Sequence, residues 1–488
     1  MTESYVLTLK LNTSPEQDRW LAHAFWCGQQ IYNALVRHCG KQLRKLIQDP
    51  EYRKLLAAHR KDDLSKKDKN RINQELASIR RGYGLSEYQL HAYVVVQQHR
   101  YKKSIDSDVA QKIASFVWSS VEKYLFDNGK CIHFRKYDEF ESMEGKKNTS
   151  GMRFKDGRLH WRGQVIQPQI RTDYDRKALK SRVKYCRIQR KPVGTKYHYY
   201  LQLVLEGKPP VKHPVGHGTA GLDIGTSTAA VVTKDSCRLT VLGSDAKDRS
   251  AQIRQIQRAM DRSRRATNPD NFLPDGTVRR GAKKWIRSKH YRKLLFRKRA
   301  MERRYADTIN TSHHRLTNEI ASKADTVYVE KMCFHGLARK SKSAVKKADG
   351  RFKSRKRFGR SIGNHAPAAF LMILGNRLVS HGGRLIKIDT ISFRASQYNH
   401  VTNDYVRKKL SCRGSIVGGH YVQRDLYSAF LLRNSNDTGT AADRQKCIDS
   451  FPMFLMTHDA CMDTLLAENK KYSSSFGLRS YERYKCNC

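Results

Sequence analysis

Three acidic residues each lie at the edge of a short apolar segment. Asp223 lies in GLDIG at positions 221–225, Glu330 ends VYVE at 327–330, and Asp425 precedes LYSA at 426–429. In a chain with 95 Lys and Arg against 45 Asp and Glu, carboxylates at such positions are not all surface charges that balance the excess of bases. Carboxylate oxygens are hard ligands that suit Mg²⁺. The three residues are therefore candidate ligands of two Mg²⁺ ions and candidate catalytic residues of a metal-dependent nuclease.

The overall charge of the chain points to a polyanionic partner. The net charge is +50 and the pI is near 10.1, and a compact fold with this charge repels itself unless a polyanion neutralises it. The chain is also 39% hydrophobic with 24 Tyr, which distinguishes it from a low-complexity basic tail. We therefore expect a folded protein of about two to four domains that binds nucleic acid over a large surface.

Two segments carry dense runs of positive charge. In residues 254–304 bases far outnumber acids, whereas an ordinary solvated helix mixes both signs. The pattern predicts a cationic helix face opposite one buried stripe, formed by Met301, Tyr305, Ile309, Leu316 and Ile320. Residues 339–360 are basic with interspersed Ser and Gly, which predicts a loop that orders on nucleic acid. The candidate nucleic-acid-binding residues are Arg279, Arg280, Lys283, Lys284, Arg287, Arg297, Lys298, Arg355, Lys356 and Arg357.

The sequence pattern of residues 1–215 predicts a β domain that contains a helical insertion. Residues 5–11 alternate as a strand, and Ser14, Pro15 and Gln17 then form the start signal of a helix. The pattern is helical over residues 14–128. Short alternating runs separated by Gly follow up to residue 215, which is typical of a β-barrel. We expect residues 1–13 and 129–215 to form the barrel and residues 14–128 to form a helical lobe inserted in it.

The elements that must position the three carboxylates lie in residues 216–435. Three adjacent antiparallel strands are expected at 220–226, 229–233 and 238–242, followed by a long helical region at 252–320 with a turn at 268–271. A buried strand ends at Glu330, a helix at 366–380 leads to a strand at 384–388, and Asp425 opens a last helix. For residues 436–488 we expect a helical appendage with a loose end. The sequence does not indicate the role of this appendage.

An Asp on the first strand, a Glu at the end of a later strand and an Asp at the start of a late helix are typical of an RNase H-like nuclease. With these motifs the chain resembles the TnpB proteins of insertion sequences and the compact type V CRISPR effectors. The resemblance includes YVEK at 328–331, and Arg424 and Asp425 followed by Ser428 and Ala429.

The resemblance implies a mixed α/β multidomain fold, in which a β-barrel (wedge-type) domain with an inserted helical lobe precedes an RNase H-like (RuvC) nuclease domain. It further implies an RNA-guided DNA endonuclease that cuts target DNA next to a short flanking motif. Its partners would be a guide RNA and target double-stranded DNA, and its cofactor two Mg²⁺ ions held by Asp223, Glu330 and Asp425.

Residues 395–424 depart from the family pattern. The family usually carries a four-cysteine zinc ribbon there, whereas this chain has Asn399, Thr402, Ser415 and Gly418 at the corresponding places. Structural zinc sites need four nitrogen or sulfur ligands, so we expect a degenerate hairpin without structural Zn²⁺. A three-ligand site that uses the nearby His400, Cys412 and His420 stays open as the alternative.

Two other functions stay open. One is an unguided, structure-selective DNA nuclease of the resolvase type, and the other is a guided DNA-binding repressor without cleavage. The sequence does not decide between a transposon and a CRISPR context, and a homodimer is possible. Eleven cysteines without a C-x-x-C pair indicate a reducing compartment. With neither a membrane-helix pattern nor a signal-peptide pattern, we expect a nucleoid-associated protein of the bacterial or archaeal cytoplasm.

Overall fold

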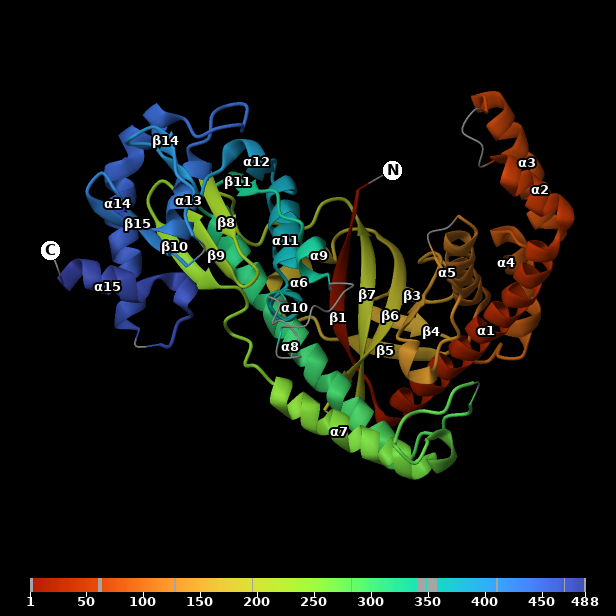
Figure 1. Cartoon of the computed structure of the whole chain (residues 1–488). Helices are drawn as coiled ribbons and strands as arrows, with labels where there is room; N and C mark the ends of the chain where they lie inside the picture. Colours follow the sequence, from red (N-terminus) through yellow and green to blue (C-terminus); the bar gives the residue numbers. More distant parts are fainter. Residues whose placement is uncertain are drawn as a thin grey trace. The chain divides into compact units, whose positions relative to one another are not determined.

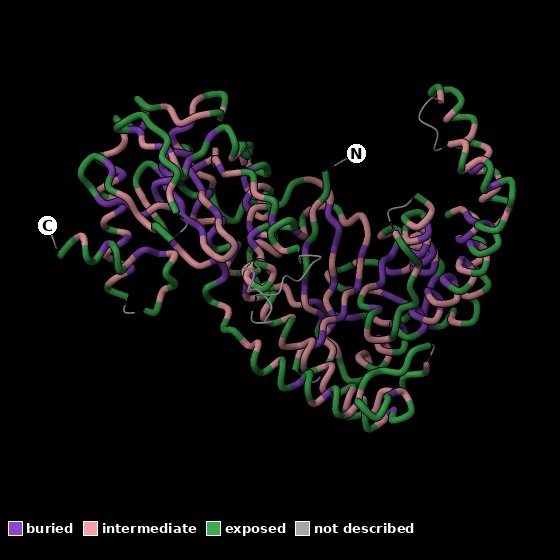
Figure 2. The backbone as a smooth tube through the Cα atoms, in the orientation of Figure 1, coloured by how far each residue is buried: buried purple, intermediate pink, exposed green. Residues whose placement is uncertain are grey.

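The structure, a computed structural model, describes residues 3–59, 64–126, 129–194, 196–281, 283–339, 348, 358–409, 411–468 and 470–486. The chain divides into two compact units, Met1–Pro210 and Val211–Cys488. In Figure 2 buried residues gather along the strands of each unit. Among the described ranges, every helix falls short of the length and apolarity that a membrane crossing needs.

Unit 1 is built on a seven-stranded sheet with the order β2-β6-β7-β1-β5-β4-β3. Its strands are β1 (Ser4–Asn12), β2 (Ser142–Glu144), β3 (Arg153–Lys155), β4 (Arg158–Trp161), β5 (Gln164–Pro168), β6 (Val183–Val193) and β7 (Lys196–Glu206). The sheet is curled (Figure 1), but no ladder joins β2 to β3 in the described part of the chain. The closed barrel that the alternation predicts is therefore an open half-barrel, because edge strands this short form few closing hydrogen bonds.

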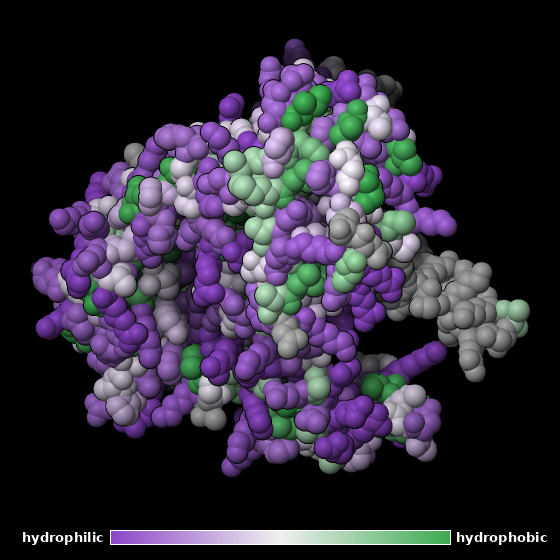
Figure 3. Space-filling model, turned by 90° about the vertical axis from the view of Figure 1, so that its left-hand side faces the viewer, coloured by the Kyte–Doolittle hydropathy of each residue, from purple (hydrophilic) through white to green (hydrophobic). Residues whose placement is uncertain are grey.

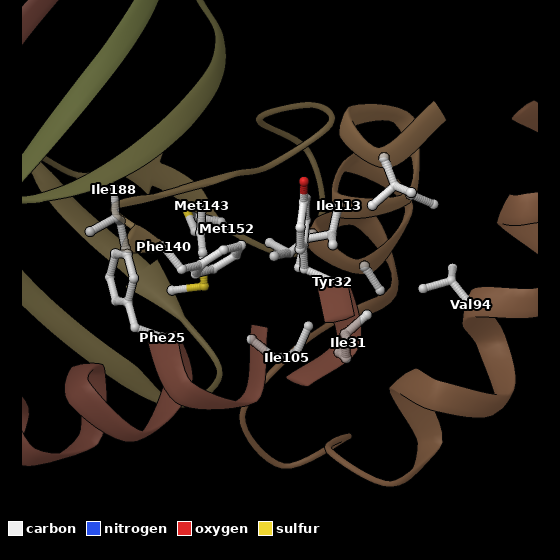
Figure 4. Packing of buried hydrophobic residues seen from close by; sticks show 14 of the residues in the cluster. Phe25, Ile31, Tyr32, Val94, Ile105, Ile113, Phe140, Met143, Met152 and Ile188 are labelled. Atoms are coloured by element: carbon white, nitrogen blue, oxygen red, sulfur yellow. The ribbon is translucent and has the colours of Figure 1, made fainter. Parts of the chain in front are cut away.

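Five helices lie between β1 and β2 in the chain: α1 (Pro15–Gln48), α2 (Pro50–His59), α3 (Lys66–Gly82), α4 (Glu87–His99) and α5 (Ser107–Leu125). The predicted capping box of Ser14 and Gln17 starts α1. Figure 4 shows Phe25 and Ile31 of α1 packed with Ile113 of α5 and Ile188 of β6 in one apolar core. Two short elements, η1 (Tyr137–Glu139) and α6 (Asp173–Ala178), complete the unit.

Unit 2 contains a five-stranded sheet with the order β10-β9-β8-β11-β12. β8 (Thr219–Ile224), β9 (Thr228–Val232) and β10 (Cys237–Val241) are antiparallel, as the sequence predicts. β11 (Thr326–Glu330) pairs parallel with both β8 and β12 (Arg384–Ile388). One face packs on α8 (Lys289–Ala321) and α11 (Pro367–Val379), and the other on α13 (Arg424–Arg433) and α14 (Arg444–Ala467).

The predicted long helix is interrupted for much longer than one turn. α7 (Ser250–Thr267) and η2 (Pro269–Asn271) are followed by an irregular stretch, and α8 begins only at Lys289. Ile309, Leu316 and Ile320 are buried as predicted, but Met301 and Tyr305 are only partly buried. The reason is that the stripe faces the sheet only in the second half of α8, while α8 also packs beside α7 (Figure 1).

The predicted loose end of the tail is wrong for the described residues, and α13 is not the last helix. α14, η3 (Ser474–Phe476) and α15 (Leu478–Cys486) place Phe454, Met462, Phe476 and Tyr481 in the same core as α13. Before α13 the chain forms two hairpins, β13 (Tyr398–Asn399) with β14 (Asp404–Tyr405) and β15 (Gly414–Val417) with β16 (His420–Gln423). The remaining short helices are α9 (Phe334–Ala338), α10 (Gly359–His365) and α12 (Thr390–Phe393). The finer domain boundaries stay predictions.

Candidate functional site

Asp223 and Glu330 come from neighbouring parallel strands. Leu222 of β8 is level with Val329 of β11, and both side chains are fully buried in the core with α8 and α11. Because successive side chains in a strand point to opposite faces, the next residues, Asp223 and Glu330, lie on the opposite face, which α13 covers. The strand register therefore places both carboxylates at the same level and on the same side of the sheet.

Gly221 lets α13 approach β8 closely enough to bring in the third carboxylate. A β-carbon at Gly221 would lie 2.6 Å from the amide nitrogen of Arg433 and closer still to the carbonyl of Ala429, so only glycine fits. Asp425 is one helical turn before Ala429, and Asp223 is two residues beyond Gly221. The close approach of helix and strand thus brings Asp425 to the end of β8 that carries Asp223.

The first turn of α13 is fixed by a chain of hydrogen bonds to the C-terminal segment. Gln423 is fully buried; its side-chain oxygen accepts from the amide of Leu426 at 2.7 Å and its side-chain nitrogen donates to the carbonyl of Ser475 at 3.2 Å. The amide of Gln423 donates to Nε2 of His458 at 2.9 Å, and Nδ1 of His458 lies 2.8 Å from the carboxylate of Asp459. Sequence reasoning missed Gln423 and His458 as positioning residues, because their partners are distant in the chain.

All three carboxylates line one cavity of ≈ 900 Å³ in unit 2. Cationic residues line the same cavity, and sequence reasoning did not propose them: Arg407, Lys408, Lys409, Arg413 and Arg424. Four of them come from the run RKKLSCR at 407–413, a short basic run that was the available signal. The cavity therefore combines carboxylates that could bind metal cations with Lys and Arg side chains that could bind phosphate.

The electrostatics of the site reflect crowded negative charge. Burial, followed by the charges of Asp425 and Glu330, raises the pKa of Asp223 well above its ordinary value, and Arg424 opposes this shift. Burial also raises the pKa of Glu330. The guanidinium of Arg424 pairs with the carboxylate of Asp425 at 3.0 Å, and both side chains are largely buried. A cation among these carboxylates would favour their ionised forms.

The carboxylates of Asp223, Glu330 and Asp425 fit hard divalent ions such as Mg²⁺, since such ions prefer oxygen ligands and all three carboxylates line the same cavity. Within the described residues, however, no group of three or more His, Cys, Asp or Glu side chains is arranged so that it could hold a metal ion. The three carboxylates share one cavity, in which Asp425 is paired with Arg424.

The described candidate nucleic-acid-binding residues are not among those that line this cavity. Those that are described, which do not line it, occupy the irregular stretch before α8 and the start of α8: Arg279, Arg280, Lys283, Lys284, Arg287, Arg297 and Lys298. Some have partners within the chain, since Arg279 donates to the carbonyl of Phe272 at 3.0 Å and Lys298 pairs with Glu302 at 2.8 Å. Arg355, Lys356 and Arg357 lie outside the described residues.

His400 belongs to an aromatic core. Its Nδ1 lies 2.8 Å from the hydroxyl of Tyr427, and its ring packs on Phe430 and Phe451. Burial lowers the pKa of His400 to about 4. Cys412 and His420, its partners in the three-ligand alternative, are both exposed.

No family model matches the chain, and no curated protein matches it. Among solved structures, the chain is similar to a Cas12f1–sgRNA–target DNA complex, with a TM-score of 0.40, 12% identity, and coverage of 90% of this chain and 99% of that one. A CRISPR-Cas12f ternary complex matches with a TM-score of 0.24, 13% identity, and coverage of 88% and 99%. A Cas12i–crRNA–dsDNA complex matches with a TM-score of 0.23 and 9% identity, and the match covers 76% of this chain and 58% of that one. Since these TM-scores are below 0.5, the similarities do not by themselves establish fold or function.

Proposed function

We propose that this chain is an RNA-guided DNA endonuclease whose RNase H-like (RuvC) domain hydrolyses phosphodiester bonds with the help of two Mg²⁺ ions. One observation carries the proposal. Asp223, Glu330 and Asp425, from two neighbouring strands and a helix, line a single cavity together with several Lys and Arg side chains. Carboxylates for metal ions beside cations for phosphate form the combination that metal-assisted phosphodiester hydrolysis needs.

The arrangement of the sheet supports the nuclease part. Three antiparallel strands are followed by two parallel ones, with Asp223 on the central strand β8. This is the strand order expected of an RNase H-like domain. The order of the three acidic motifs, which resembles that of TnpB and compact type V effectors, supports the guided part, and so does the net charge of +50, which suits a chain that carries a large RNA.

Asp223, Glu330 and Asp425 would hold the metal ions. When bound, the two ions supply an activated water and stabilise the negative charge that develops on the leaving oxygen. Arg407, Lys409 and Arg413 would hold the backbone of the DNA across the cavity, because charge-assisted hydrogen bonds to phosphate are strong. Arg424 would position the carboxylate of Asp425 at the wall of the cavity.

The test is cleavage of double-stranded target DNA by the full-length chain, purified together with RNA expressed from its flanking locus. We expect a discrete RNA to copurify and cleavage to stop when EDTA removes the divalent ions. Asp223→Ala should lower the cleavage rate by several orders of magnitude and leave target binding intact. The matched control is Asp270→Ala, an exposed Asp of η2 outside the cavity, which should cleave like wild type.

Two results would overturn the proposal. Cleavage by Asp223→Ala at nearly the wild-type rate, or cleavage that continues in EDTA, would rule out the metal mechanism. Copurification of only heterogeneous RNA would rule out the guide and leave an unguided nuclease.

A second candidate function is guided DNA binding without cleavage. It is favoured by the ion pair between Arg424 and Asp425, which occupies one of the three carboxylates. The same assay distinguishes it, because such a protein would bind the target with a discrete RNA and leave it uncut when Mg²⁺ is present.

A further inference from the structure

A second cavity in unit 2, of ≈ 640 Å³, lies between residues 411–413 and the C-terminal segment 470–480. Four of its lining residues are cationic, namely Arg413, Lys470, Lys471 and Arg479, several others are serines, and none is acidic. We call it the C-terminal cavity. Figure 3 views the side of the molecule that carries α14 and α15 in Figure 1, and hydrophilic residues dominate that face.

Most of the positive charge in the C-terminal cavity has no internal counter-charge. Lys470 pairs with Glu468 at 2.6 Å. Across the part of the chain that the structure describes, no carboxylate forms an ion pair with Arg413, Lys471 or Arg479. Cations that share a cavity repel one another unless an anion joins them. With serine hydroxyls as additional donors, the cavity is suited to a phosphate group.

The lining of the C-terminal cavity suits a nucleic-acid backbone better than a base. Among the described residues, Tyr472 is the one aromatic residue that lines it, and its ring already packs on Phe476 with centroids 4.6 Å apart. The hydroxyl of Tyr472 also donates to Glu468 at 2.5 Å. Because no free aromatic face lines the cavity, it offers charge and hydrogen bonds but no stacking platform for a base.

Arg413 connects the C-terminal cavity to the cavity of the three carboxylates, since it lines both. The two walls are also packed together: Gly477 has a φ of +71°, and a β-carbon there would lie 3.2 Å from the β-carbon and the carbonyl oxygen of Arg413. Ser475 lines the carboxylate cavity and accepts the hydrogen bond from Gln423. Arg413 therefore forms a wall that the two cavities share.

We infer that the C-terminal cavity binds a backbone phosphate of the DNA strand that enters the carboxylate cavity, as a sequence-independent second grip. The inference rests on the proposed nuclease function for the identity of the strand. Phosphates of the guide RNA have the same chemistry, but the shared wall at Arg413 favours the strand that is cut. Arg479 is the best probe because it is exposed and does not line the carboxylate cavity.

The experiment compares Arg479→Glu with Arg483→Glu in the full-length chain. Both residues are exposed on α15, one helical turn apart, but only Arg479 lines the cavity. The probe is a fluorescein-labelled single-stranded DNA of about 20 nucleotides, not complementary to any copurified RNA. Binding is measured by anisotropy in EDTA over a salt series, so the result does not depend on cleavage. An RNA probe of the same sequence is run in parallel.

We expect Arg479→Glu to weaken DNA binding about 10-fold and to reduce the salt slope by about 1, with Arg483→Glu within about twofold of wild type. Wild-type affinity in Arg479→Glu, or equal losses in both variants, would overturn the inference. A loss for the RNA probe alone would overturn the assignment to the DNA strand. Failure of the nuclease proposal would instead appear as absent Mg²⁺-dependent cleavage with this binding difference still present.

Discussion

At the scale of single residues, the site depends on side chains whose charge is controlled by burial. Asp223 and Glu330 have raised pKa values because burial disfavours their ionised forms. Gln423 and His458, both fully buried, hold the turn that carries Asp425. His400 is equally buried, and since its neighbours are aromatic, its protonation would place a charge in the core.

The contribution of His400 to the stability of unit 2 should therefore fall as the pH is lowered, opposite in sign to the contributions of Asp223 and Glu330. The pKa of His400 is about 4 in the folded chain and about 6.5 in an unfolded one. Because the unfolded state binds more protons between these values, the free energy of unfolding falls as the pH drops from about 6.5 to about 4 and levels off below. The His400 contribution to this fall is on the order of 2–3 kcal/mol.

Thermal unfolding measured across this pH range would check the prediction. His400→Phe keeps an aromatic ring without a titrating group, so its melting temperature should fall less steeply with pH than that of wild type. The matched control is His420→Phe at an exposed histidine, which should keep the wild-type slope. Equal slopes for wild type and His400→Phe would contradict the assigned pKa.

At the scale of elements, the site is made by the contact between a strand and a helix. β8 and β11 fix two carboxylates through their register, and α13 adds the third because Gly221 has no side chain to hold the helix away. The C-terminal elements add hydrogen bonds to the start of α13 through His458 and Ser475. A change that separates α13 from β8 should therefore affect stability and catalysis together.

Gly221→Ala tests this contact. The added methyl group meets the backbone of α13, which cannot move aside cheaply, so we expect a loss of about 3 kcal/mol of stability together with loss of cleavage. The matched control is Gly375→Ala inside α11, where a β-carbon would lie 3.4 Å from a Leu385 methyl group, an ordinary contact. This variant should be neutral or gain up to about 1 kcal/mol. Unfolding temperatures that are equal for Gly221→Ala and wild type would show that α13 is not seated on β8.

At the scale of the whole molecule, the net charge of +50 governs how the chain meets nucleic acid. Each phosphate that Lys or Arg neutralises releases condensed counterions, which makes affinity depend on salt. In the proposed function the three carboxylates serve cleavage, whereas the Lys and Arg surface serves binding. The two activities should therefore respond differently to salt and to divalent ions.

Binding of target DNA by the cleavage-deficient Asp223→Ala chain should fall steeply with salt. We expect the slope of log affinity against log salt concentration to be about −5 or steeper. Filter binding across a salt series would measure it, and an uncharged osmolyte at matched osmolality should leave the affinity unchanged. A slope near zero would mean that the excess of Lys and Arg is not used for binding phosphate.

The sequence by itself determined the order of the main strands and helices of unit 2 and supplied the three candidate site carboxylates, which the structure places in one cavity. Asp223, Glu330 and the strands that carry them follow from local alternation and from acids placed beside apolar runs, and such patterns depend on neighbours in the chain. The same local rules predicted the capping box at Ser14 and the three antiparallel strands of unit 2.

Only the tertiary structure decided which residues share a cavity. The roles of Arg413, Gln423 and His458 depend on partners tens of residues away, and no local pattern carries that information. The tail was misjudged for the same reason, since Phe476 and Tyr481 are isolated in sequence and become core residues only when α14 and α15 pack on α13. Burial is a property of the assembled unit, and so are the pKa values and the cavities that it creates.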